Sequence, residues 1–260
     1  MTGSVVAGGS AGRDRSVVAH GPAGRSVVSE RGRLAAGAGL AATLALTNLV
    51  AAPRLGRPAS AAWNLGATGV VLTMARRAGL DLAALGLDPG RVRRGLLVGA
   101  AGSALVAGLM GAAAASPTGR ELLDDDRVVD ATVGQTLLHV GVYIPLGTVV
   151  FEEVAFRGAL PALLDPAGRS VARSVVVPAV VFGAWHIVSG RAFVAAHQHG
   201  DQPTGSVRGI VASTTAAGLV LGAARRVGGH LAAPGLMHLT ANALATVLGR
   251  EVGRRRRRDR

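Results

Sequence analysis

The chain has 260 residues, of which 49% are hydrophobic and only 17% are charged, and its formal net charge is +13. This balance is too apolar for an ordinary soluble domain, and the absence of cysteine excludes disulfides, thiolate metal sites and thiol proteases. All basic residues are arginines that lie between apolar blocks, and aromatic residues are only 3%, so the composition also argues against nucleic-acid binding.

Residues 1–32 are rich in Gly, Ser and Arg and contain a loose repeat, SVVAGGSAGRDR, SVVAHGPAGR and SVVSERGR. They hold too few apolar residues to bury a core, so we expect a disordered arm. Because this long polar stretch precedes the first apolar block, we expect that block to remain as a membrane span and not to be removed as a signal peptide.

Seven apolar blocks follow the arm, and each meets or approaches the ~20 residues that a helix needs to cross a bilayer. The blocks are 34–52, 60–75, 95–116, 133–163, 171–190, 207–224 and 230–249. They predict an all-α, polytopic transmembrane helical bundle of about seven spans (six to eight). The transmembrane domain covers 33–250, and a polybasic tail follows at 251–260. We interpret 78–88 as an interfacial amphipathic segment.

Loop arginines predict the orientation, because they concentrate on the cytoplasmic side. The arm, the 76–94 loop and the 169–173 turn are basic, whereas the 117–130 loop is acidic. We therefore expect an integral protein of a bacterial plasma membrane with a cytoplasmic N-terminus. Seven spans would place the basic tail outside, which the same rule disfavours, so either one segment is re-entrant or the number of spans differs by one.

Three of the predicted spans contain ionisable or polar side chains, in the stretches FEEVAFRG, FGAWH and HLTAN. Such groups cost ~2.5–3.5 kcal/mol each on insertion, so they normally face a bundle interior or a water-filled cavity. Glu153 and Arg157 are four residues apart, a spacing that favours an ion pair, while Glu152 points about 100° away from that face. His238 and Asn242 share the four-residue spacing and project together.

The same three spans predict a common depth for their polar groups. At a rise of about 1.5 Å per residue, Glu153 lies roughly 15 Å before the LDPAGR turn and His186 roughly 22 Å after it. His238 lies roughly 12 Å after the RRVGG turn. All three groups fall near the middle of the membrane, which indicates one site. Prolines at 145, 178 and 234 precede these groups and are expected to kink the helices and open a wet cavity.

The polar motifs, taken in order, resemble those of the CPBP family of intramembrane proteases. This family includes type II CAAX prenyl endopeptidases, bacteriocin-processing and immunity proteins, and lysostaphin-resistance-like proteins. The matching motifs are EExxxR (Glu152, Glu153 and Arg157), FxxxH (Phe182 to His186) and HxxxN (His238 to Asn242). The resemblance covers about residues 130–250 and implies a helical, membrane-embedded endopeptidase that cleaves a membrane-associated protein or peptide.

The resemblance also implies roles for these residues. Glu152 and His186 would hold and activate water, and His238 and Asn242 would polarise the scissile carbonyl and stabilise its oxyanion. The remaining pair, Glu153 and Arg157, would orient the site. A carboxylate desolvated in a bundle suits a general base that later returns its proton.

Metal dependence stays open at the level of the sequence, because the family has been described both as metalloproteases and as glutamic proteases. Glu152, His186 and His238 are ligands that zinc accepts. The chain lacks the HExxH helix that places two ligands on one face. We therefore favour a glutamate mechanism without a cofactor, with zinc as the alternative.

Two other functions compete with the protease hypothesis: a non-catalytic membrane immunity or assembly protein, and an ion or proton transporter that uses the buried carboxylates. The complete motif set disfavours the first, and the lack of internal repeats disfavours the second. The Glu153–Arg157 pair taken alone is more typical of structure, since buried charges need partners. The coincidence of three polar spans favours the protease, with the lipid bilayer and a membrane-associated substrate as partners.

Overall fold

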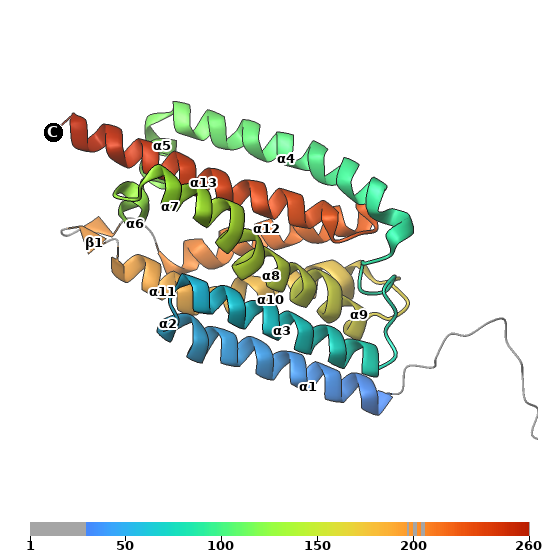
Figure 1. The fold of residues 1–260 in the computed structure, drawn as a ribbon. Helices are drawn as coiled ribbons and strands as arrows, with labels where there is room; N and C mark the ends of the chain where they lie inside the picture. Colours follow the sequence, from blue (N-terminus) through green and yellow to red (C-terminus); the bar gives the residue numbers. More distant parts are fainter. Residues whose placement is uncertain (1–29, 197, 200–201, 204–205, 260) are drawn as a thin grey trace, which may run out of the picture.

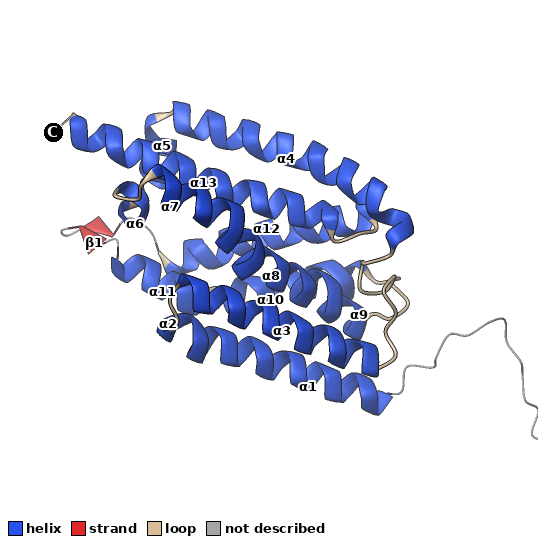
Figure 2. Ribbon diagram, in the orientation of Figure 1, coloured by secondary structure: helices blue, strands red, loops and turns tan. Residues whose placement is uncertain are grey.

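The computed structural model describes residues 30–196, 198–199, 202–203 and 206–259. Most of the predicted arm therefore lies outside the described residues, and its last part, 30–32, already belongs to the first helix. Within the described ranges the chain is a bundle of long helices, as Figures 1 and 2 show. The predicted all-α class is confirmed.

The elements that precede the motifs are α1 (Glu30–Leu46), the π-helix η1 (Thr47–Ala51), α2 (Ala52–Arg54), α3 (Arg57–Arg77), the 3-10 turn η2 (Pro89–Arg91), α4 (Val92–Ala115), α5 (Pro117–Leu123) and α6 (Asp126–Val129). The elements of the first motif helix are α7 (Val133–Leu138), π-helices η3 (His139–Tyr143) and η4 (Pro145–Val149), α8 (Val150–Glu153), π-helix η5 (Val154–Ala159) and α9 (Leu160–Leu164). The remaining elements are π-helix η6 (Ala172–Val176), α10 (Val177–Trp185), α11 (Ile187–Ala196), the antiparallel strands β1 (Gln198–His199) and β2 (Gln202–Pro203), α12 (Val207–Gly228) and α13 (Ala232–Arg258).

Each of the seven predicted blocks lies within helix. Among the described residues, five helical stretches are long and apolar enough to cross a membrane: Glu30–Arg54, Pro89–Ala115, Val133–Leu164, Ala172–Ala195 and Val207–Gly228. The other two, α3 and α13, are about 31 and 40 Å long but carry more polar side chains. The leucines of α4 are exposed on the outside of the bundle, as a lipid-facing surface requires. The protein is therefore an integral membrane protein.

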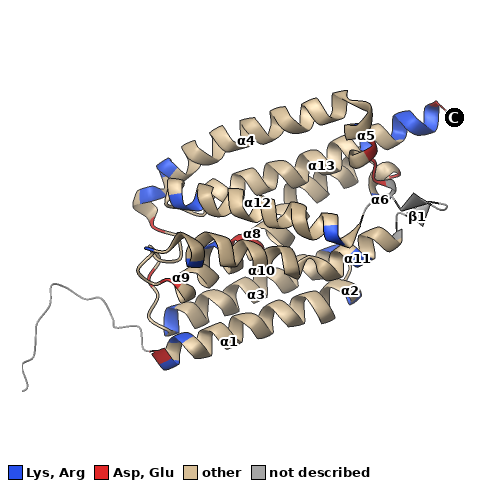
Figure 3. Ribbon diagram, turned by 180° about the vertical axis from the view of Figure 1, so that it is seen from behind, with Lys and Arg blue, Asp and Glu red and all other residues tan. Residues whose placement is uncertain are grey.

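The two ends of the bundle differ in charge (Figure 3). Arginines gather where α1 begins, where α4 begins and where α12 ends, and these points share one end. The acidic segment around α5 and α6 lies at the other end, together with the C-terminus. The acidic loop is thus separated in space from the basic loops, and the arginine-rich end of α13 lies beside the acidic loop.

The polybasic segment is the end of α13, because this helix continues to Arg258. Its arginines pair with the acidic end: Arg256 lies 2.5 Å from Asp124, and Arg257 lies 2.6 Å from Asp130. The C-terminus lies at the end of the bundle opposite the start of α1 (Figure 1), and the acidic partners offset part of its charge. An uneven number of crossings is therefore compatible with a basic C-terminus.

Wide π turns surround the glutamate pair and follow from the chain's prolines. A proline lacks the N–H that would bond back along the helix, and a π turn is one way to accommodate this loss. Pro145 begins η4, and Pro178 follows η6. Pro234 does not kink α13, contrary to expectation, because it lies in the first turn, where backbone N–H groups have no helical partner.

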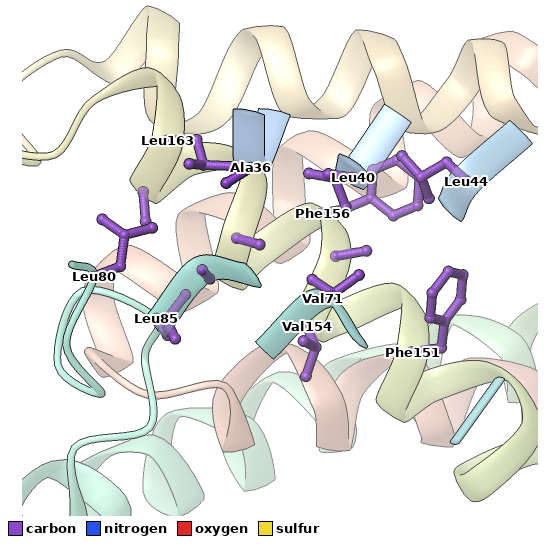
Figure 4. Close-up of a cluster of buried hydrophobic side chains, with 14 of the residues drawn as sticks. Ala36, Leu40, Leu44, Val71, Leu80, Leu85, Phe151, Val154, Phe156 and Leu163 are labelled. Atoms are coloured by element: carbon purple, nitrogen blue, oxygen red, sulfur yellow. The ribbon is translucent and has the colours of Figure 1, made fainter. Parts of the chain in front are cut away.

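A hydrophobic core packs against this irregular helix (Figure 4). Phe151 and Phe156, on either side of the glutamates, are fully buried, and they meet Leu40 and Leu44 of α1 and Val71 of α3 in one cluster. Aromatic side chains on both sides of a carboxylate pair fix the direction in which the carboxylates point. Core packing therefore aims the site towards α10 and α13.

We predicted an interfacial amphipathic segment at 78–88. The structure shows a series of turns there, which pack on the core. Gly79 and Gly86 adopt positive φ angles of 88° and 78°, which end helical structure and suit glycine. Leu80 and Leu85 are buried in the main core, and the Gly86 carbonyl accepts the Leu231 N–H at 2.8 Å. The loop thus closes the basic end of the bundle.

Close packing of α4 on α13 depends on small residues, which allows a stability test. A Cβ at Gly99 would lie 2.9 Å from the Ala232 carbonyl oxygen and 3.0 Å from Leu236, whereas a Cβ at Gly108 of the same helix meets nothing within 4 Å. Gly99→Leu should destabilise the protein by about 1–3 kcal/mol through overpacking, and Gly108→Leu should not. Thermal denaturation in detergent measures both; equal melting temperatures for the two variants would contradict this packing.

Candidate active site

The carboxylate of Glu153 is shared by two cationic or potentially cationic partners. Its Oε1 atom accepts a hydrogen bond from Arg157 Nη1 at 3.2 Å and another from His238 Nδ1 at 2.7 Å. Both Glu153 and Arg157 are only 3% exposed. The predicted Glu153–Arg157 ion pair is present, and the structure adds the contact to α13, which spacing within one helix does not reveal.

Glu152 lies beside this pair but forms no hydrogen bond with it through Oε2. Its Oε2 atom is 3.7 Å from His238 Nε2, beyond hydrogen-bond distance, and has no hydrogen-bond partner among the described residues. Because the carboxylate of Glu153 accepts from Nδ1, the Nε2 face of the imidazole is directed towards Glu152. A gap of this length between two polar groups suits a bridging water or a substrate oxygen.

His186 occupies the break between α10 and α11. Its Nδ1 donates to the Phe182 carbonyl oxygen at 2.8 Å, which leaves the Nε2 lone pair available as an acceptor. Its ring packs edge-on against Phe182 and Trp185, with centroid distances of 4.5 and 5.3 Å. Within the described part of the chain no direct hydrogen bond joins His186 to Glu152 or His238.

The aromatic ring of Phe182 connects the two halves of the site. The Arg157 guanidinium lies over this ring, 4.1 Å from its centroid, in a cation–π contact. The centroid is also 6.2 Å from that of His238 and 4.5 Å from that of His186. All three motifs therefore meet around one ring, and Asn242 follows His238 by one turn of α13, half-buried.

Two asparagines that the sequence interpretation passed over hold the backbone beside the motifs. Asn48 Nδ2 donates to the Trp185 carbonyl at 2.6 Å, directly before His186. Asn64 Nδ2 donates to the Gly147 carbonyl, in the π turn before Glu152. Both asparagines lie in predicted spans, so the rule that flags polar residues in membrane helices applies to them equally.

The metal alternative names Glu152, His186 and His238. Among the described residues, no group of three or more His, Asp or Glu side chains is arranged to hold a metal ion. The Nδ1 atoms of both histidines are engaged, one with a carbonyl oxygen and the other with Glu153, which leaves Nε2 of each ring as the possible metal ligand. As they stand, the three side chains are not arranged around one metal position.

Removing the shared carboxylate should destabilise the fold. In Glu153→Ala, the buried Arg157 loses its counter-charge, a change that typically costs about 3–5 kcal/mol. Glu251→Ala is the matched control, because Glu251 and Arg255 form an exposed pair with the same spacing on α13, and it should unfold like the wild type. Thermal unfolding in detergent compares them, and an equally small effect of both changes would show that the buried pair is not required for stability.

The comparisons with known proteins concern the same part of the chain. Residues 134–244 match the family model described as type II CAAX prenyl endopeptidase Rce1-like. No curated protein and no solved structure matches the chain. The matched segment begins at the helix that carries the glutamates and ends just beyond Asn242, so it includes all three motifs. The match supports the predicted resemblance to the CPBP family for this part of the chain.

Proposed function

We propose that the protein is a membrane-embedded endopeptidase that cleaves peptide bonds of a membrane-associated protein or peptide. The observation that carries the proposal is the contrast between two adjacent buried carboxylates. Glu153 is held by Arg157 and His238, whereas Glu152 Oε2 is unpartnered among the described residues and faces the imidazole across 3.7 Å. An ion pair that only stabilises the fold does not require a second carboxylate without a partner. A general base, in contrast, must be a carboxylate that is free to accept a proton.

In the proposed reaction, Glu152 accepts a proton from a water molecule, with the Nε2 lone pair of His186 as a second acceptor. The resulting hydroxide attacks the scissile carbonyl carbon and forms a tetrahedral oxyanion. The carbon–nitrogen bond then breaks, and the proton held by Glu152 passes to the leaving amine. Water supplies the atoms added to both products, so no cofactor is required for the balance.

His238 and Asn242 are the proposed donors to the oxyanion. The proposal uses the imidazolium form of His238, in which Nδ1 donates to Glu153 and Nε2 offers a second hydrogen to the oxyanion. A preset donor of this kind is typically worth about 2.7–4 kcal/mol to the transition state.

The central test is cleavage of a membrane-tethered reporter by the purified protein in lipid vesicles. Glu152→Gln keeps the shape of the side chain but removes the base, so kcat should fall by a factor of roughly 10²–10⁴. His186→Ala and His238→Ala should also lower kcat. His139→Ala is the control, because this histidine lies on the same irregular helix but away from the motifs.

Cleavage by Glu152→Gln at the wild-type rate would refute the proposed base. The same assay addresses metal dependence: the glutamate mechanism predicts that a chelator leaves the rate unchanged. Loss of activity with chelator and recovery with zinc would instead assign Glu152, His186 and His238 to a metal centre.

We also propose that the N-terminus lies on the cytoplasmic side of the membrane, because α1 begins at the end of the bundle where the basic loops gather, whereas the acidic loop around α5 and α6 lies at the other end (Figure 3). The chain has no native cysteine, so single cysteines report orientation cleanly. In intact cells, an impermeant maleimide should label Thr118→Cys at the acidic end but not Ala167→Cys at the basic end. The reverse labelling pattern would invert the proposed orientation.

A further inference from the structure

A pocket of about 370 Å³ opens at the basic end of the bundle, separate from the gap between Glu152 and His238. Its walls come from the 83–91 loop, from the end of the glutamate helix and the turn after it, and from the last turn of α12. These segments lie at the end where Figure 3 shows arginines gathered. The pocket is thus formed between membrane-crossing helices at the level of a membrane surface.

The charges that line this pocket are unbalanced. Four arginines contribute to its walls, Arg91, Arg157, Arg225 and Arg226, against one carboxylate, Asp165. Asp165 is already used locally, because it accepts the Ser170 backbone N–H at 2.6 Å. Because Arg91 pairs with Asp88 and Arg157 with Glu153, the excess positive charge of the pocket comes from Arg225 and Arg226.

Two of these guanidinium groups have unused donors. Arg157 Nη2 and Arg225 Nε are buried and have no hydrogen-bond partner among the described residues. Burying a charged donor without an acceptor is costly, so such donors call for an acceptor such as an ordered water or an anion. Arg226, by contrast, is anchored, since its Nη1 donates to the Ser174 hydroxyl at 2.8 Å and to the Gly168 carbonyl at 3.2 Å.

The neighbouring His230, in the turn between α12 and α13, reports the same positive field. Burial lowers its pKa below the usual range, and the positive charge of Arg225 lowers it further, while Asp88 acts in the opposite direction. The Nδ1 atom of His230 accepts the Ala232 N–H at 2.9 Å.

We propose that this arginine-lined pocket binds a phosphate group, supplied by the headgroup of an anionic phospholipid. Guanidinium forks match the oxygen geometry of phosphate, and basic pockets between transmembrane helices at a membrane face are sites for anionic headgroups. A lipid is favoured over a soluble phosphate because the walls are the ends of helices that cross the bilayer, where headgroups are always present.

The bound headgroup would share one side chain with the candidate active site. Arg157 Nη1 donates a hydrogen bond to Glu153. The same guanidinium lines the pocket, and its Nη2 atom has no hydrogen-bond partner among the described residues. A phosphate there would satisfy the second nitrogen and hold the guanidinium in place from the other side. Lipid binding itself does not require catalysis, so it can be measured even if no proteolysis is found.

The test measures retention of phosphatidylglycerol by the purified full-length protein. The protein is loaded with phosphatidylglycerol, diluted into phosphatidylcholine nanodiscs, and analysed for retained lipid by native mass spectrometry. Arg225→Gln should bind the anionic lipid roughly ten-fold more weakly, as loss of one charge-assisted donor set implies. Arg208→Gln, at the opposite end of the same helix, removes the same charge and should retain the lipid like the wild type.

Arg226→Gln, at an exposed position, provides a second variant if Arg225→Gln does not fold, and it too should weaken retention. Wild-type retention by the folded pocket variants would overturn the proposal. So would a pocket that binds inorganic phosphate in an Arg225-dependent way while retaining no lipid. Arg225-dependent binding of a peptide with a free C-terminal carboxylate, without lipid retention, would assign the pocket to substrate instead.

Discussion

A carboxylate buried in a helical bundle must find opposite charge and hydrogen-bond donors, and the way Glu153 does so organises the rest of the molecule. One oxygen accepts from Arg157 on its own helix and from His238 on α13. The first contact follows from four-residue spacing, and the second joins two spans separated by 85 residues. Because both partners are donors, the arrangement fixes the orientation of the imidazole and directs its other nitrogen towards Glu152. The different surroundings of the two adjacent glutamates are thus a consequence of how Glu153 is paired.

The helices outside the matched segment contribute more than a lipid-facing wall. Asn48 and Asn64, on η1 and α3, donate to carbonyl groups next to His186 and in the π turn before Glu152. Both carbonyls belong to irregular places, one where α10 breaks and one where the helix widens. Side-chain amides in a membrane interior supply the hydrogen bonds that water cannot. The N-terminal helices therefore support the very irregularities that the motif helices need in order to aim their side chains.

Charge is also organised at the two ends of the bundle, by different means. At the end that contains α5 and α6, arginines of the last turns of α13 form ion pairs with Asp124 and Asp130, so that part of the positive charge is offset within the chain. At the basic end, the arginines of α12 and of the glutamate helix outnumber their carboxylates and leave donors free. One end therefore contains ion pairs within the chain, while the other contains the pocket for which we propose an anionic ligand. The cluster of motif residues lies between the two ends.

The sequence by itself determined the membrane class, the helical blocks and the residues of the three motifs, because hydropathy, helical spacing and the cost of burying charge are local properties. The Glu153–Arg157 pair is predictable for that reason: both residues lie on one helix four positions apart. Local patterns could not show that Glu153 binds His238, that Phe182 lies among all three motifs, or that the 78–88 segment is a set of turns buried on the core. They also could not show that the basic end of α13 meets the acidic segment around α5 and α6. Each of these features depends on which helix faces which, and only long-range packing decides that.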